Sequence, residues 1–132
     1  KPYSQGPKVH YVSNVDGAHV TDVLAGLDAQ TTLVIVASKT FTTIETLTNA
    51  ETALRWMGQS VANPADQFVA LSTADDKTAA FGISPDRVFG FEDWVGGRYS
   101  LRVPIGLSLA LAIVVDNFTA SLTGSAALDV HF

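Results

Sequence analysis

The chain has 132 residues, of which 47% are hydrophobic and 16% are charged, so it has enough apolar material for a core and too little charge for a disordered chain. Its net charge of −5, without any basic cluster, argues against nucleic acid as a partner and requires local donors for any anionic ligand. The absence of cysteine excludes disulfides, thiolate metal sites and a catalytic thiol.

The first part of the chain is predicted to alternate strand and helix. It begins at Lys1 without an initiator methionine or an apolar signal segment, which predicts a piece of a longer protein. The β-branched and aromatic residues 9–13 predict a short strand, and the spacing of apolar residues over 18–27 predicts an amphipathic helix. Residues 33–37 form a continuous apolar run, which predicts a strand buried on both faces, as in a parallel sheet.

A long helix is predicted after the polar loop at residues 38–43. Its apolar residues recur at alternating steps of three and four, which places them on one face: Leu47, Ala50, Leu54, Met57 and Val61. Thr42 and Glu45 have the spacing of a capping box at its start, and Asn63-Pro64 is expected to end it.

Two further strands are predicted beyond this helix. Residues 68–71 and 88–91 are apolar strand candidates, and residues 77–81 predict a short helix between them that ends at Gly82. Strands that alternate with helices predict an α/β domain with a parallel sheet, and nothing in the sequence indicates a second domain.

The C-terminal part is predicted to be helical. Pro104 is suited to the first turn of a helix that runs to about Val115. The longest apolar run of the chain, residues 103–115, is shorter than the roughly 20 residues that a bilayer span needs, so we expect a buried helix and no membrane partner. Asp116-Asn117 is expected to interrupt it before a further helix begins.

The loop at residues 38–43 carries the most chemistry. It contains four hydroxyls and one ammonium group, contributed by Ser38, Lys39, Thr40, Thr42 and Thr43. It lies between a buried strand and a helix N-terminus, where α/β sheets bind ligands and where unpaired N–H groups attract anions. A phosphate site is one interpretation, and simple helix capping by a hydroxyl is the other. The loop is not a Walker motif, because no glycine-rich run precedes Lys39.

A second candidate site is the turn Gly96-Gly97-Arg98. Two glycines let a backbone approach a ligand closely, and the planar guanidinium of Arg98 is suited to oxyanions. An ion pair between Arg98 and Glu92 or Asp93 is the simpler alternative.

Other ionisable residues carry weaker signals. The carboxylates Glu45 and Glu51 are explained by capping or helix-surface roles. The three histidines show no metal-ligand spacing, so no metal site is predicted: His10, His19 and His131.

These motifs resemble a known family. The stretch from Ser38 to Ala50 is similar to the "SKTFTT-x-ET-x-TNA" motif of glucose-6-phosphate isomerases, and residues 93–100 are similar to their "DWVGGRYS" signature. Residues 9–17 (VHYVSNVDG), 68–72 (FVALS) and 116–118 also match in order, so the resemblance covers nearly the whole chain.

The resemblance implies a fold and a reaction. Family members have two sugar isomerase (SIS) domains, each a parallel sheet flanked by helices in a Rossmann-like three-layer arrangement, and residues 1–132 resemble an incomplete part of the first. They interconvert glucose 6-phosphate and fructose 6-phosphate through a cis-enediolate in glycolysis and gluconeogenesis. They need no metal or organic cofactor, form homodimers and are mostly cytoplasmic.

The resemblance also implies roles for particular residues. Ser38, Thr40 and Thr43 would bind the phosphate with Lys39 in the same loop, and Arg98 would stabilise enediolate charge as a catalytic residue. Two departures are expected to be tolerated: Ile44 stands where many members have Gln, and residues 102–104 replace the common "WSA".

Several family residues are expected to lie outside this chain. The glycine-rich "GIGGS" loop should precede Lys1, and the catalytic Glu, the ring-opening His and a late Lys should follow Phe132. We therefore expect a fragment with little or no turnover of its own. The alternatives are a non-catalytic SIS-type module that binds a sugar phosphate, or a chain without ligand function that self-associates through exposed edges.

Overall fold

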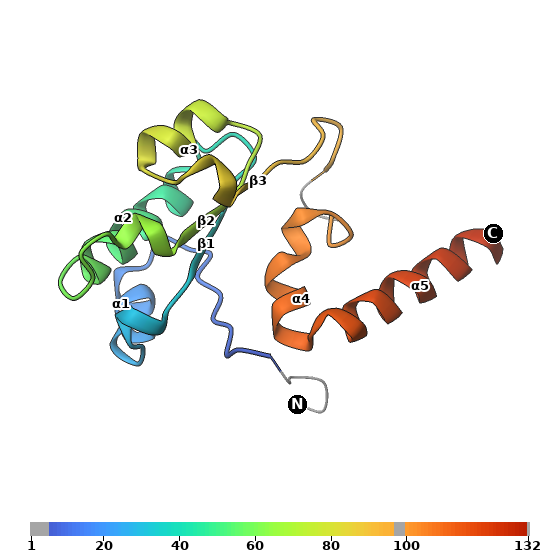
Figure 1. Ribbon diagram of the computed structural model, residues 1–132, viewed down its shortest axis with the longest axis horizontal. Coiled ribbons are helices and arrows are strands. Elements are labelled where there is room, and N and C mark those ends of the chain that lie inside the picture. The colour runs from blue at the N-terminus through green and yellow to red at the C-terminus, as the bar shows by residue number, and fades with distance from the viewer. Residues whose placement is uncertain (1–5, 97–99, 132) are drawn as a thin grey trace. The chain divides into compact units, whose positions relative to one another are not determined.

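The structure is a computed structural model, and it describes residues 6–96 and 100–131. It divides into two compact units, one formed by His10–Val95 and the other by Lys1–Val9 with Gly96–Phe132. Figure 1 shows both units, and each is described by itself below.

The first unit is built on a parallel sheet. Its strands are β1 (Val34–Ala37), β2 (Phe68–Leu71) and β3 (Val88–Phe89), in the order β1-β2-β3. Val34 pairs with Phe68, and Ala70 pairs with Val88. Because the strands are parallel, their carboxyl ends meet at one edge, and the predicted α/β class with a parallel sheet is confirmed.

Three helices accompany these strands, and two of them connect consecutive strands. They are α1 (Gly17–Ala25), α2 (Ile44–Met57) and α3 (Asp75–Phe81). Apolar periodicity predicted the first two, and α3 begins two residues before the short helix predicted at 77–81. α2 packs on β1, and α1 packs on α2 (Figure 1). Short 3₁₀ turns lie between the regular elements: Ala29–Thr31, Pro64–Gln67 and Pro85–Arg87.

The core of this unit joins the helices to the sheet. Met57 on α2 and Phe68 on β2 are fully buried, and Ile83 follows α3 with 1% of its surface exposed. Burial of each such side chain contributes about 1.5–3 kcal/mol. The predicted apolar face of α2 is therefore the face that holds the helix against the sheet.

Two strand predictions were wrong. Residues 9–13 form no strand, since an isolated extended segment has no ladder to pair with, although Val12 still packs against the core. β1 is not buried on both faces, because it is an edge strand: Ala37 is exposed, whereas all four residues of β2, the central strand, are buried.

Helix and strand ends also differ from the predictions. α2 ends at Met57, well before Asn63-Pro64, and the N–H of Gly58 closes its last turn on Leu54 at 2.9 Å. β3 spans two residues of the predicted 88–91, because only Val88 and Phe89 pair with β2. Gly82 ends α3 as predicted, with a left-handed φ of 100° that favours glycine.

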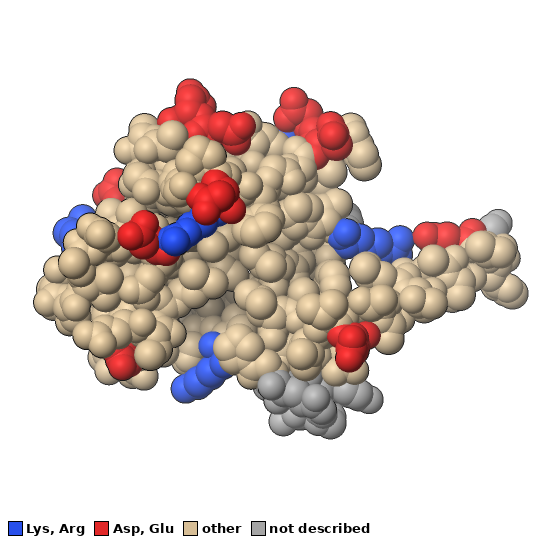
Figure 2. All heavy atoms as spheres, viewed as in Figure 1, with Lys and Arg blue, Asp and Glu red and all other residues tan. Residues whose placement is uncertain are grey.

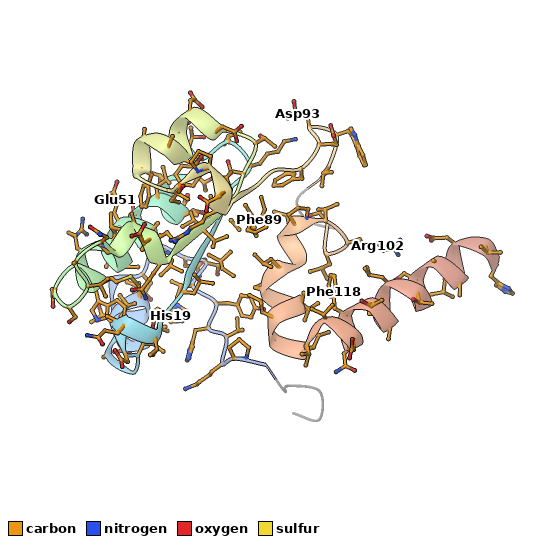
Figure 3. All side chains as sticks on the ribbon, viewed as in Figure 1. His19, Glu51, Phe89, Asp93, Arg102 and Phe118 are labelled. Atoms are coloured by element: carbon orange, nitrogen blue, oxygen red, sulfur yellow. The ribbon has the colours of Figure 1, made fainter. Side chains whose placement is uncertain are left out.

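The regular elements of the second unit, over the residues that the structure describes, are helices. The expectation of a buried helix after Pro104 was wrong, because no residue of the helix at 107–113 is fully buried. A 3₁₀ turn (Pro104–Gly106) leads into α4 (Leu107–Ile113), and α5 (Val115–His131) packs on α4. Arg102 donates to the Asp129 carboxylate at 3.2 Å. Arg102 and Phe118, both labelled in Figure 3, line the same pocket.

The break between α4 and α5 lies at Val114, two residues before the predicted Asp116-Asn117. Val114 takes a positive φ of 66° there, and its carbonyl accepts the N–H of Phe118 at 3.1 Å. Asp116 and Asn117 lie inside the first turn of α5, where a carboxylate complements the helix dipole. Asn117 also donates to the carbonyl of Ile113 at 2.8 Å, so this pair joins the two helices. Among the helices of the described residues, none combines the length and apolarity needed to cross a membrane.

Candidate functional site

The loop at residues 38–43 leaves the carboxyl edge of the sheet. The N–H of Ser38 donates to the carbonyl of Leu71 at 3.1 Å, which continues the β1–β2 ladder by one step. The loop then enters α2 at Ile44. It therefore lies between a strand end and a helix N-terminus, as the sequence predicted.

The predicted phosphate-binding hydroxyls lie close together. Ser38 Oγ lies 3.3 Å from Thr43 Oγ1, and Thr40 Oγ1 lies 2.7 Å from Thr42 Oγ1. Ser38 is buried, whereas the three threonines are exposed. The loop thus presents a set of hydroxyl donors to solvent from a base that is fixed in the sheet.

The start of α2 has no side-chain cap. Thr43 is the N-cap residue, but its hydroxyl makes no capping bond. The predicted capping box was wrong, because Thr42 pairs with Thr40 and the helix begins one residue later than the box requires. The expectation that one hydroxyl of the loop caps the helix is also contradicted. The first N–H groups of α2 are therefore available to an anion.

Lys39 links the loop to the segment after β3. Its ammonium group donates to the main-chain carbonyl of Asp93 and lies 3.9 Å from the Asp93 carboxylate. Figure 3 shows Asp93 in the segment that follows β3. A second ammonium group, that of Lys77, donates to the carbonyl of Thr40 at 3.2 Å. Two cations therefore border a loop in a protein whose net charge is negative.

The buried side chain of Phe41 holds the loop against the core. Only 3% of its surface is exposed, and its ring packs edge to face on Phe81 of α3 with centroids 5.7 Å apart. Its φ is 50°, a left-handed value that is uncommon for an aromatic residue. The backbone turns sharply at Phe41 so that its ring enters the core while the neighbouring threonines stay outside.

The second predicted site is described only in part. Gly96 is exposed, as are the adjacent acidic residues Glu92 and Asp93. Gly97 and Arg98 lie outside the described residues, so the role of Arg98 and its pairing remain predictions.

Sequence reasoning missed two residues at this edge. Ser72 and Thr73 follow β2, and both hydroxyls donate to the carbonyl of Lys39 at 3.0 Å. The signal was available, because residues that follow adjacent parallel strands meet at the same edge. Ser72 entered the sequence analysis only as the last residue of the motif at 68–72, and Thr73 was not singled out.

Lysine and arginine are few in this chain, with eight in 132 residues. On the face that Figure 2 shows, the Lys and Arg side chains are scattered and form no patch. In the part of the chain that the structure describes, no group of three or more His, Asp or Glu residues is arranged to hold a metal ion. The groups that this loop offers a ligand are hydroxyls, main-chain N–H groups and ammonium, all of which suit an oxyanion.

Comparison with known families gives one match over the whole chain. The family model described as phosphoglucose isomerase matches residues 1–132. A glucose-6-phosphate isomerase of Cereibacter sphaeroides (strain ATCC 17025) is 70% identical over 131 residues, and one of Roseobacter denitrificans is 67% identical over the same length. Each alignment covers 99% of this chain and 25% of the relative, so the chain spans about a quarter of the length of these curated relatives.

Solved structures give the same result. A glucose-6-phosphate isomerase from Chlamydia trachomatis matches with a TM-score of 0.75 and 32% identity, over 89% of this chain and 23% of the other. A hypothetical protein from Thermus thermophilus matches with a TM-score of 0.72 and 27% identity, over 83% and 28% of the two chains. The resemblance predicted from the sequence is confirmed.

Proposed function

This chain belongs to the phosphoglucose isomerase family, and on that premise we propose that it supplies the phosphate-binding loop of a glucose-6-phosphate isomerase. One observation carries the proposal: Ser38, Thr40 and Thr43 gather at the uncapped N-terminus of α2. A sugar phosphate carries about two negative charges at neutral pH. Hydroxyl donors and a helix dipole hold such a group without bulk positive charge, which suits a chain of net charge −5.

The reaction is assigned to the longer protein. Its relatives are about four times as long as this chain, so we propose that the full-length enzyme interconverts glucose 6-phosphate and fructose 6-phosphate. On the sequence motif alone, Arg98 stabilises the enediolate charge, and Gly96 and Gly97 allow close backbone approach. Family membership also supports a cytoplasmic homodimer, and neither nucleic acid nor membrane is part of the proposal.

Phosphorus NMR tests the binding role directly. The chain is titrated with fructose 6-phosphate beside a variant in which Ser38, Thr40 and Thr43 are all replaced by Ala. A charge-assisted hydrogen bond contributes about 1.5–3 kcal/mol, so the triple variant should bind at least about a hundredfold more weakly. Thr48→Ala is the matched control, because Thr48 is an exposed threonine further along α2.

Two results would count against the proposal. Absence of saturable binding by the unaltered chain would remove the phosphate role from this loop, and equal binding by the triple variant would place the ligand elsewhere. An isomerase assay on the full-length protein separates the enzyme from the alternative, a non-catalytic sugar-phosphate-binding module, because only the enzyme turns over.

A further inference from the structure

The segment that follows β2 contacts the phosphate loop through one atom of Lys39. Three donors converge on the main-chain carbonyl oxygen of Lys39: the hydroxyls of Ser72 and Thr73 and the N–H of Thr73, each at 3.0 Å. Both residues are distant from Lys39 in sequence, and the parallel pairing of β1 with β2 brings them there. The next carbonyl of the loop, that of Thr40, is held separately by Lys77 at 3.2 Å.

The hydroxyl of Ser72 is committed to this contact. Ser72 is completely buried, and its Oγ accepts the N–H of Ala74 at 3.2 Å. A serine hydroxyl has one hydrogen to donate, and the bond from Ala74 leaves that hydrogen directed at Lys39. The orientation of the donor is therefore set by the backbone at the start of α3.

A fixed carbonyl fixes the whole peptide plane. The peptide between Lys39 and Thr40 is trans, so its N–H points opposite to its C=O. Since the Lys39 carbonyl is turned toward the end of β2, the N–H of Thr40 is turned away from it. Among the described residues, no acceptor is found for that N–H.

We propose that Ser72 and Thr73 are positioning residues for sugar-phosphate binding, acting by holding the Lys39–Thr40 peptide in its ligand-binding orientation. This inference rests on the phosphate role proposed above for the loop. Without the two hydroxyls only the N–H of Thr73 still holds this carbonyl, so the peptide is less firmly oriented and the donors of Lys39 and Thr40 lose their fixed common direction. Affinity then falls although every residue that touches the ligand is still present.

A purely structural role predicts something different. If the two hydroxyls only satisfy a buried carbonyl, removing them lowers stability but leaves the affinity of the folded protein unchanged. Thr78 supplies the comparison, because it is a buried threonine on α3 whose hydroxyl donates to the carbonyl of Asp75 at 2.9 Å, away from the loop. Thr78→Val therefore removes a similar bond without touching Lys39.

The experiment is a phosphorus NMR titration of the chain with fructose 6-phosphate, repeated with inorganic phosphate. The variants are Thr73→Val, Thr73→Ser, Ser72→Ala and Thr78→Val, and urea unfolding confirms that each is folded. Loss of one such hydrogen bond corresponds to about a tenfold change in affinity. We expect that loss in Thr73→Val and Ser72→Ala, wild-type affinity in Thr73→Ser, which keeps the hydroxyl, and wild-type affinity in Thr78→Val.

A nitrogen-15 spectrum adds a measurement, the chemical shift of the Thr40 amide, that a change in protein stability alone does not affect. In the unaltered chain the Thr40 amide resonance should shift when fructose 6-phosphate is added, and in Thr73→Val this shift should be reduced.

The outcomes separate the two proposals. Binding by the unaltered chain with equal affinity in Thr73→Val overturns the positioning role and leaves the phosphate site intact. An equal loss in Thr78→Val, or failure of Thr73→Ser to retain affinity, shows a general structural effect and also overturns it. Absence of binding by the unaltered chain overturns the proposed function, and the positioning role with it.

Discussion

Replacing Phe41 by Ala and by Gly should give an order of stability opposite to that of an ordinary buried position. At most buried sites Gly is the worse substitution, because it costs about 0.5–1 kcal/mol more backbone entropy than Ala. At Phe41 the φ of 50° reverses this, since a residue with a Cβ pays about 1–2 kcal/mol in the left-handed region and Gly does not. We therefore expect Phe41→Gly to be about 0.5–1 kcal/mol more stable than Phe41→Ala.

Both variants should be strongly destabilised relative to the unaltered chain. Only 3% of the Phe41 surface is exposed, and truncation of a buried phenylalanine to alanine typically costs about 3–5 kcal/mol. About 0.5–1.5 kcal/mol of this belongs to the edge-to-face contact with Phe81. Because small domains have total stabilities of only about 5–15 kcal/mol, the loss should be a large shift of the unfolding midpoint.

Urea unfolding followed by Trp56 fluorescence measures this order. Trp56 lies on α2 and packs against the core, whereas Trp94 is 82% exposed, so a Trp94→Phe background isolates the core signal. A Phe41→Ala variant more stable than Phe41→Gly would refute the left-handed conformation. A loss below about 1 kcal/mol in both variants would refute the burial of the ring in the core.

Two further predictions concern a helix end and the ion pair beside the loop. Gly82→Ala should lower the free energy of unfolding by about 1–2 kcal/mol through its φ of 100°, since the added Cβ would meet only the Ala65 side chain at an ordinary 3.5 Å. In contrast, Gly17→Ala should be neutral or stabilising by up to about 1 kcal/mol, because Gly17 lies in a helix with open space around it. An equal loss of unfolding free energy for both substitutions in urea unfolding would contradict the argument. Asp93→Asn should tighten binding of fructose 6-phosphate by up to about fivefold, because it removes an exposed carboxylate that competes for Lys39, and exposed ion pairs contribute about 0.2–1 kcal/mol. Weaker binding in that phosphorus NMR titration would show instead that Asp93 orients Lys39 for the ligand.

Most of the local structure was readable from the sequence. β2 spans the predicted residues 68–71, because a short apolar run between turn residues has few other folded states. Gly82 ends α3 as predicted, since a left-handed helix end favours glycine over other residues. The strand predicted at residues 9–13 failed because a strand exists only where a partner strand pairs with it, and composition carries no information on that partner.

The candidate site could likewise be predicted from the sequence only in part. The residue types at Ser38, Thr40 and Thr43, and their place between a strand and a helix, were set by the sequence and its family motifs. The pairing of these hydroxyls with one another was not set by the sequence, because side-chain rotamers and the exact start of α2 depend on packing around Phe41. The contacts of Ser72 and Thr73 with Lys39 were decided by the tertiary structure alone. They join residues more than 30 positions apart, and only the parallel register of β1 and β2 brings those residues to one carbonyl oxygen.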